Sequence, residues 1–174
     1  MYRDSRKGRI IYSLFLVVAT ALIVYFAGNF ARGGNNETSK GLSTELTGGK
    51  CTIEVECKTV LDHRDMLDLD LRKLVPKGGI ILKKTEVDLE KNDSAFTVLA
   101  RVLKENDINY ETSGTSDNIY VKGIGDFYEF SCGQQSGWLY SVNGVQPKIS
   151  SAARQVKAGD EIVWHFTCEM GDFK

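Results

Sequence analysis

The sequence is short of the residues and motifs that carry most enzyme chemistry. It has only two histidines, two prolines and four cysteines in 174 residues. No G-x-S-x-G, H-E-x-x-H or C-x-x-C motif occurs, and Gly123-x-Gly125 lacks the strand–helix context of a phosphate-binding loop. The 22 Lys and Arg residues are balanced by 23 Asp and Glu, so no basic excess favours nucleic acid. We therefore expect a protein that is not an enzyme, requires no cofactor and binds no nucleic acid.

The N-terminal region holds the one long apolar run. Residues 10–28 (IIYSLFLVVATALIVYFAG) carry no charge and follow a basic tail over residues 1–9. A helix rises about 1.5 Å per residue, so this run just spans a hydrocarbon core of roughly 30 Å. A cleaved signal peptide is the alternative, but its apolar region is usually shorter and ends in a small-x-small site. The pattern predicts a single-pass membrane anchor with a cytoplasmic N-terminus and everything after it outside the cell.

The residues after the anchor change in composition twice. Residues 29–50 are rich in Gly, Asn, Ser and Thr and have few apolar side chains, which predicts a flexible stalk. The folded extracellular domain is expected over residues 51–174. All four cysteines lie in it, and an even set fits a compartment where disulfides persist.

Short strands around one helix make up the expected domain. Residues 51–60 alternate apolar and charged side chains, as a half-buried strand does, and residues 94–106 place apolar side chains at helical spacing after Asp93 or Ser94 as N-cap. Further extended segments are GIILKKTEVDLE, INYET, NIYVKGI, FYEF, WLYSV and the closing EIVWHFTC. This order predicts an α+β fold, a β-grasp-like mixed sheet packed on one helix, with the first and last strands as central partners.

The cysteine spacing limits the disulfide pairing. Cys51 and Cys57 lie on one predicted strand, roughly 20 Å apart if extended, whereas bridged Cα atoms lie within about 7 Å. If the first and last strands run parallel, Cys57 and Cys168 lie at the same end of the sheet. We therefore predict the pairs Cys57–Cys168 and Cys51–Cys132.

Aromatic and amide side chains gather in the segment QQSGWLYSVNG. Trp138 and Tyr140 are two residues apart, so they lie on one face of a strand. They either cover the core or offer a flat platform to a ligand, and the polar residues just upstream could hydrogen-bond ligand amides. The candidate ligand-binding residues are Gln134, Gln135, Ser136, Gly137, Trp138 and Tyr140.

Metal binding has weaker support. The acids between residues 62 and 70 could hold calcium, but their spacing lacks the central Gly and terminal Glu of an EF-hand loop, and solvated acids on a short helix are the simpler interpretation. Neither His63 nor His165 has further ligands beside it in the sequence. We expect no metal site. The four acids are Asp62, Asp65, Asp68 and Asp70.

Several segments in this order resemble one family of small extracellular domains. They are C-x5-C, LVPKGGIIL, EVDLEKNDSAFTVLARVLKEN, YVKGIGDFYEFSCG, SGWLYSVNG and VKAGDEIVWHFTC. The family is domain of unknown function 4430, common in Gram-positive bacteria and similar to the C-terminal domain of transcobalamin and intrinsic factor. The likeness spans roughly residues 51–172. It implies a β-grasp-like fold and the binding of cobalamin or another corrinoid. The family usually carries a further Cys before KAGDEIVW, where this chain has Ser150 and Ser151.

The sequence therefore predicts a membrane-anchored extracellular binding module. Its ligand would be cobalamin, another corrinoid or a similar small molecule at the cell surface, with a transporter as a possible protein partner. The alternative is an interaction or adhesion module without a small ligand, which uses its sheet edge or aromatic face. A concave, polar-rimmed pocket around Trp138 would favour the first, and a flat exposed patch the second.

Overall fold

The computed structural model describes residues 49–169 and 171–172. The predicted tail, the anchor over residues 10–28 and nearly all of the stalk lie outside these residues. Within them, no helix is long and apolar enough to cross a membrane.

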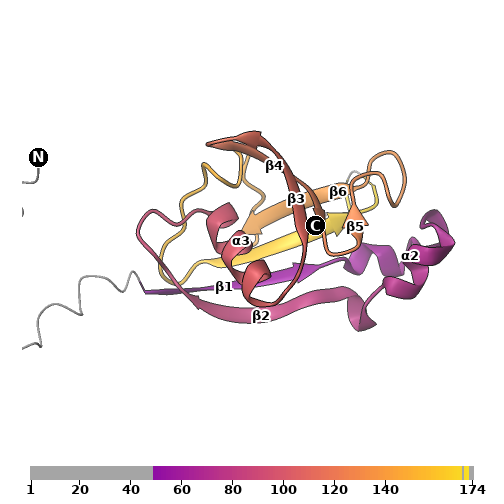
Figure 1. The fold of residues 1–174 in the computed structure, drawn as a ribbon, viewed down its shortest axis with the longest axis horizontal. Helices are drawn as coiled ribbons and strands as arrows, with labels where there is room; N and C mark the ends of the chain where they lie inside the picture. The colour runs from indigo at the N-terminus through magenta and orange to yellow at the C-terminus, as the bar shows by residue number, and fades with distance from the viewer. Residues whose placement is uncertain (1–48, 170, 173–174) are drawn as a thin grey trace, which may run out of the picture. The chain divides into compact units, whose positions relative to one another are not determined.

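A four-stranded mixed sheet forms the centre of the domain. Its strands are β1 (Lys50–Glu56), β2 (Ile80–Asp88), β6 (Gly137–Val142) and β7 (Glu161–Thr167), in the order β2-β1-β7-β6. β1 and β7 run parallel in the middle, and the two outer strands pair antiparallel to them (Figure 1). The expected central pairing of the first and last strands is confirmed.

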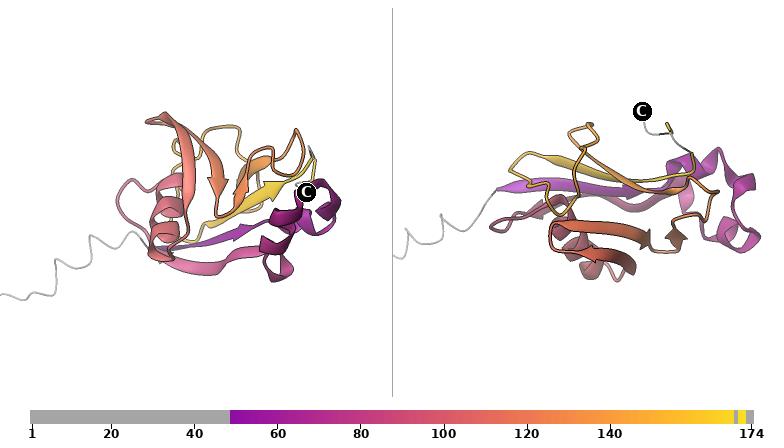
Figure 2. Two further views of the ribbon diagram at one scale, coloured as in Figure 1. Left: turned by 45° about the vertical axis from the view of Figure 1, so that its right-hand side comes forward. Right: turned by 90° about the horizontal axis from the view of Figure 1, so that it is seen from above.

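A second, smaller sheet lies over one face of the first. It consists of β3 (Tyr110–Thr115), β4 (Asn118–Ile124) and β5 (Phe127–Tyr128), all antiparallel in the order β3-β4-β5. Figure 2 shows this sheet and the helix α3 (Ala95–Glu105) on the same side of the four-stranded sheet. The predicted α+β class with a mixed sheet is confirmed, and the division into two sheets is a new finding.

Helix α3 begins where the sequence predicted. The Ser94 hydroxyl accepts a hydrogen bond from the Thr97 amide (3.2 Å), and the Ser94 amide donates to the Thr97 hydroxyl (2.8 Å). This reciprocal pair is a capping box, which satisfies two amides that the helix itself leaves unpaired. Of the side chains that the helical spacing placed on one face, Leu99, Val102 and Leu103 are buried in the core, whereas Phe96 is half-buried.

Four short helical segments fill the connection between β1 and β2. β1 ends at Glu56 rather than near residue 60, because Cys57 leaves the extended conformation (φ −132°, ψ 42°) and starts a 3-10 turn. The acidic segment is thus broken into single turns that end before Pro76. The segments are η1 (Lys58–Leu61), η2 (Arg64–Met66), α2 (Leu69–Leu74) and η3 (Lys77–Gly79).

One hydrophobic core joins the two sheets and α3. The inward faces of β1 and β7 supply alternate residues such as Ile53 and Phe166, both fully buried. The small sheet adds Phe127, whose ring lies 5.6 Å from that of Phe166. The predicted inward face of β7, with Ile162, Trp164 and Phe166, is confirmed.

The disulfide predictions are wrong. Cys132 is bonded to Cys168, with 5.1 Å between their Cα atoms, and Cys51 and Cys57 are free, buried thiols. The parallel register places Glu56 beside His165, so Cys57 continues beside Phe166, and Cys168 lies two residues beyond it. The loop after β5 carries Cys132 to that end of β7, while Cys51 lies at the opposite end of β1.

Candidate functional site

A hollow of about 350 Å³ opens beside the start of β6. Five of the six predicted ligand-binding residues line it, because β6 begins at Gly137 and the polar residues just upstream turn over its end. Exposed aromatic rings and the start of the C-terminal segment complete its wall. The predicted residues are Gln134, Gln135, Ser136, Gly137 and Trp138, and the added ones include Tyr120, Phe130, Thr167 and Glu169.

A second hollow of about 210 Å³ continues along the same strand. It holds the sixth predicted residue, Tyr140, and shares Tyr120, Trp138 and Leu139 with the first hollow. Its far wall comes from the loop over residues 146–151. We call the two adjoining hollows the β6 groove. The structure thus brings all six predicted residues to one concave site.

Trp138 and Tyr140 form the floor of the β6 groove rather than a platform on its surface. Trp138 is 5% and Tyr140 8% exposed. The Trp138 indole donates to the Phe127 carbonyl (2.9 Å), and the Tyr140 hydroxyl donates to the Ile149 carbonyl (2.8 Å). The Tyr140 ring stacks on that of Trp164 at 5.3 Å. Both residues therefore belong mainly to the core, with one edge at the groove.

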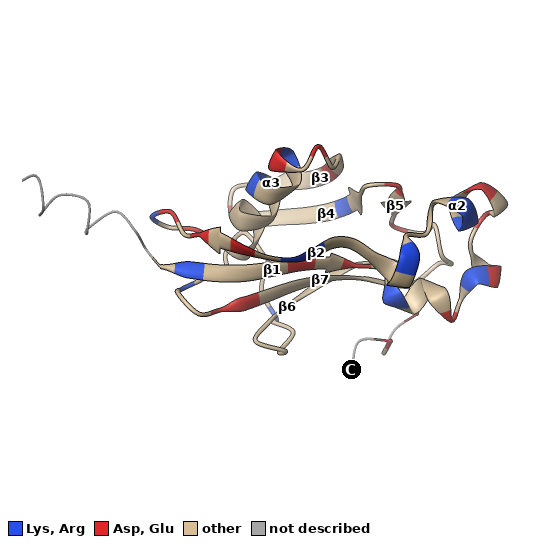
Figure 3. Ribbon diagram, turned by 90° about the horizontal axis from the view of Figure 1, so that it is seen from below, with Lys and Arg blue, Asp and Glu red and all other residues tan. Residues whose placement is uncertain are grey.

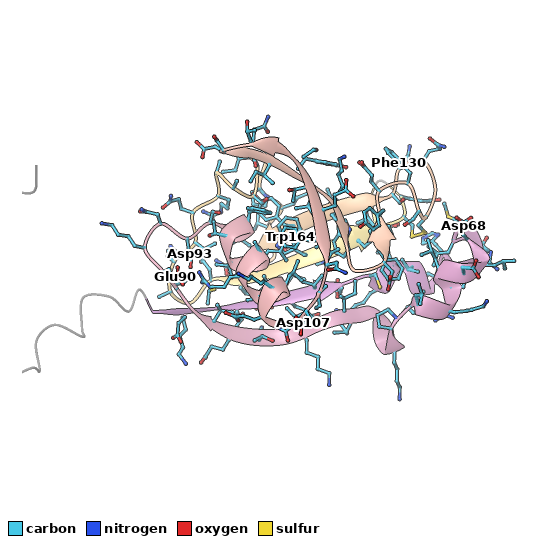
Figure 4. All side chains as sticks on the ribbon, in the orientation of Figure 1. Asp68, Glu90, Asp93, Asp107, Phe130 and Trp164 are labelled. Atoms are coloured by element: carbon cyan, nitrogen blue, oxygen red, sulfur yellow. A yellow bond between two sulfur atoms is a disulfide. The ribbon has the colours of Figure 1, made fainter. Side chains whose placement is uncertain are left out.

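The accessible aromatic surface comes from Tyr120 and Phe130, which sequence reasoning did not single out. They are 47% and 62% exposed and lie on opposite elements, β4 and the loop after β5. In Figure 4 Phe130 lies at the outer rim of the molecule and Trp164 in its interior. These two residues reach the larger hollow because the small sheet lies over the large one, and their neighbours in the sequence carry no signal for that packing.

The loop that carries Phe130, which we call the Phe130 rim, is held in a fixed geometry. Phe130 has a positive φ of 69°, which is rare and strained for a bulky residue. Its amide donates to the Ser136 carbonyl (3.1 Å), and the Ser136 hydroxyl accepts from the Cys132 amide (3.0 Å). The Cys132–Cys168 disulfide then ties this loop to the end of β7. An exposed aromatic ring on a strained, cross-linked loop is arranged as a preformed contact surface.

Tyr120 is also fixed in place. Its hydroxyl donates to the Glu129 carboxylate (2.7 Å). Burial, followed by this hydrogen bond and the negative charge of Glu129, raises the pKa of Tyr120 to about 12. The phenol therefore stays protonated and keeps its ring oriented at the junction of the two hollows.

A polar side chain below the smaller hollow lacks a partner. Trp164 lines that hollow, and among the described residues no acceptor reaches its buried indole N–H. An unpaired buried donor costs roughly 1–3 kcal/mol. A carbonyl or hydroxyl oxygen brought into the hollow is the kind of group that would relieve this cost.

On the opposite face of the sheet three side chains form a polar chain across three strands. The Nδ1 atom of His165 lies 2.7 Å from the Glu56 carboxylate, and its Nε2 atom lies 3.1 Å from the Ser141 hydroxyl. The neutral ring satisfies both contacts when Nδ1–H donates to Glu56 and Ser141 donates to Nε2. Lys58 pairs with the other oxygen of Glu56. The sequence places these residues far apart, and the strand register brings them together.

This order of groups matches that of a Ser-His-acid catalytic triad, but the surroundings differ. The Ser141 side chain lies in the middle of a strand and is 1% exposed, so no acyl group can approach its oxygen. None of the three residues lines the β6 groove. We interpret Glu56, His165 and Ser141 as a buried polar network that joins β1, β7 and β6.

The network makes stability depend on pH. Burial, and then the nearby Lys58 ammonium, lower the pKa of His165 to about 4, with Glu54 opposing them. The unfolded chain binds this proton near pH 6.5, so the stabilisation is complete above that pH and is lost as the pH falls towards 4. Between pH 7.5 and 4.5 we expect the wild type to lose about 2 kcal/mol more than His165→Gln in urea unfolding. Equal losses in the two proteins would contradict the assignment.

Metal-ligating residues do not converge in the part of the chain that the structure describes, where no group of three or more His, Cys, Asp or Glu could hold an ion. The four acids considered for calcium are therefore not assembled into a site, and Asp70 pairs with Lys73 (3.3 Å). His63 lies 3.7 Å from the carboxylate of Asp172.

The described residues form a small α+β domain with a concave site beside β6. Residues 93–168 match the model of the family described as domain of unknown function DUF4430, and this match supports the resemblance that the sequence motifs indicated. No curated protein matches the chain. Among solved structures, a protein of Ruminococcus gnavus ATCC 29149 with a provisional metal-binding description is 14% identical, with a TM-score of 0.39. The match covers 68% of this chain and 96% of that one.

Proposed function

We propose that this protein is a binding module that holds a small ligand in the β6 groove. The observation that supports this best is the groove itself, in which exposed rings from Tyr120 and Phe130 face polar groups from residues 134–136. Small-molecule sites combine an apolar wall with a few placed polar groups in this way. We further propose, from the apolar run at residues 10–28, that the module is anchored at the cell surface.

The proposed ligand is cobalamin, another corrinoid or a similar flat molecule with amides at its edge. Two aromatic rings can pack on a flat apolar ring system, while the Gln134 and Gln135 amides can pair with amides at the ligand's periphery. The strand order, with a parallel central pair and an antiparallel strand on each side, supports the β-grasp-like type from which this ligand class was inferred.

The first test is a titration of the purified full-length chain with cobalamin and cobinamide, followed by tryptophan fluorescence. We expect saturable quenching, and Phe130→Ala should weaken the affinity about fivefold to tenfold because it removes one aromatic contact. Val145→Ala is the matched control, since Val145 is 67% exposed and apolar but does not line the groove. No quenching up to high micromolar ligand would reject the corrinoid proposal, and equal affinity in both variants would reject the placement of the ligand in the β6 groove.

The alternative function is a protein-interaction module. It is favoured by the exposed apolar side chains around the groove, which include Ile149 as well as Tyr120 and Phe130. A transporter subunit or another surface protein is the partner class that fits a surface-anchored module.

A further inference from the structure

Among the described residues, strand β6 lies at the edge of the four-stranded sheet and pairs with no strand on its outer side. Asn143 donates its amide to the Glu161 carbonyl (2.8 Å), and Val142 exchanges hydrogen bonds with Val145 instead of with β7. Hydrogen-bonded pairs alternate along an antiparallel ladder, so Leu139 and Ser141 face β7. The main-chain N–H and C=O groups of Trp138 and Tyr140 therefore point away from it.

These four main-chain groups are unsatisfied within the described residues. No backbone or side-chain partner is present there for the amide or the carbonyl of Trp138 or Tyr140, and β4, the nearest strand on that side, is not paired with β6. Trp138 lines both hollows and Tyr140 lines the smaller one, so this edge of β6 runs beside the β6 groove. Unpaired N–H and C=O groups on alternate residues are what an edge strand presents, and an added strand can form hydrogen bonds with them.

The outer strand at the other edge of the sheet, β2, carries charges and irregular pairing that β6 lacks. β2 carries Lys83 and Lys84 and breaks its register twice against β1, and lysines and bulges are common devices against strand addition. β6 contains no charged residue and pairs with β7 without a register shift. In Figure 3 β1 and β2 carry blue and red segments, whereas β6 is tan throughout.

The surroundings of the free edge suit an apolar, uncharged chain. Tyr120, Phe130 and Ile149, all exposed, line the two hollows beside it. Glu169 is the one charged residue among those lining the hollows. Side chains of an added strand would enter these hollows while its main chain pairs with β6.

We propose that the β6 edge binds an extended peptide segment of a partner protein by strand addition, with apolar uncharged residues seated in the β6 groove. The contact goes beyond the small-ligand proposal, since it uses the main chain of Trp138 and Tyr140 rather than the side chains at the Phe130 rim. A partner bound in this way would compete with a small ligand for the same hollows.

The test begins with a phage-displayed library of random dodecapeptides selected on the full-length chain, followed by synthesis of the selected peptide with single N-methyl groups. N-methylation removes one main-chain donor and keeps the side chain. Strand addition predicts losses of about tenfold at every second position and little change at the positions between them. Hydrogen exchange should then slow at the Trp138 and Tyr140 amides and stay unchanged along β2.

Three results would overturn the proposal. They are the absence of any enriched peptide, sensitivity to N-methylation without a two-residue period, and protection along β2 in place of β6. A Val145→Ala control should bind the peptide with unchanged affinity. Failure of corrinoid binding leaves this prediction in force, because neither the library nor the exchange measurement involves a corrinoid, and failure here leaves the corrinoid titration standing.

Discussion

Replacing Cys132 and Cys168 together by alanine should lower the free energy of unfolding by about 4 kcal/mol. The bond closes a loop with a sequence separation of 36 residues, and this value follows from the chain entropy that such a cross-link removes from the unfolded state. Chemical denaturation of the oxidised wild type and the double variant measures the difference. We also expect weaker ligand binding in the variant, because the bond fixes the loop that carries Phe130.

The free thiols provide the control for this prediction. Cys57→Ala should cost only about 1 kcal/mol, the transfer free energy of one small buried group. Burial raises the pKa of the Cys57 thiol to about 12, so this thiol should resist alkylation in the native protein at neutral pH. A non-reducing peptide map that links Cys57 to Cys168, or a double variant as stable as the wild type, would contradict the observed pairing.

Phe166→Ala should produce the second large effect, a loss of about 3–5 kcal/mol in unfolding free energy. The ring is fully buried and contacts both Phe127 (5.6 Å between ring centres) and Trp138 (5.3 Å). Its removal leaves a cavity directly beneath the floor of the β6 groove. Urea unfolding measures the loss, and the emission of Trp138 should shift to longer wavelength as water enters.

Val163, on the same strand as Phe166, is the control that separates the loss of core packing from a change in strand propensity. Val163 lies on the opposite face of β7 and is only half-buried. Val163→Ala should therefore cost about 1 kcal/mol or less, with unchanged tryptophan emission. Similar losses in the two variants would show that the core does not depend on the aromatic cluster around Phe166.

The sequence predicted those parts of the fold that depend on local pattern. Alternation along β1 and β7 identified two half-buried strands, and their positions at the two ends of the domain indicated that they are central. The spacing of Leu99 and Leu103 and the polar residues before them identified α3 and its cap. The segment around Trp138 could be singled out because its aromatic and amide residues are contiguous in the chain, and the structure places these residues along the β6 groove with Trp138 and Tyr140 mainly in the core.

The parts that were missed depend on register and on contacts between distant segments. The register of β1 and β7 pairs Glu56 with His165, so Cys57 lies two residues short of Cys168 along the sheet and the two thiols are not bonded. Residues two apart lie on the same face of a strand, so the alternation of side chains does not reveal this offset. Glu56, Ser141 and His165 meet only because three strands align. Tyr120 and Phe130 meet at the groove because the small sheet packs over the large one, and their own neighbours in sequence say nothing about that.

The parallel pair at the centre of the sheet also decides how the domain would respond to mechanical load. β1 starts the described domain and β7 closes it, side by side and in the same direction, with Thr52 beside Glu161 and Glu56 beside His165. A force that pulls the start of β1 away from the end of β7 slides the two strands along each other. All the main-chain hydrogen bonds between them are then strained together and do not break one after another. Tension applied between the residues before β1 and those after β7 would therefore load this central pair in shear.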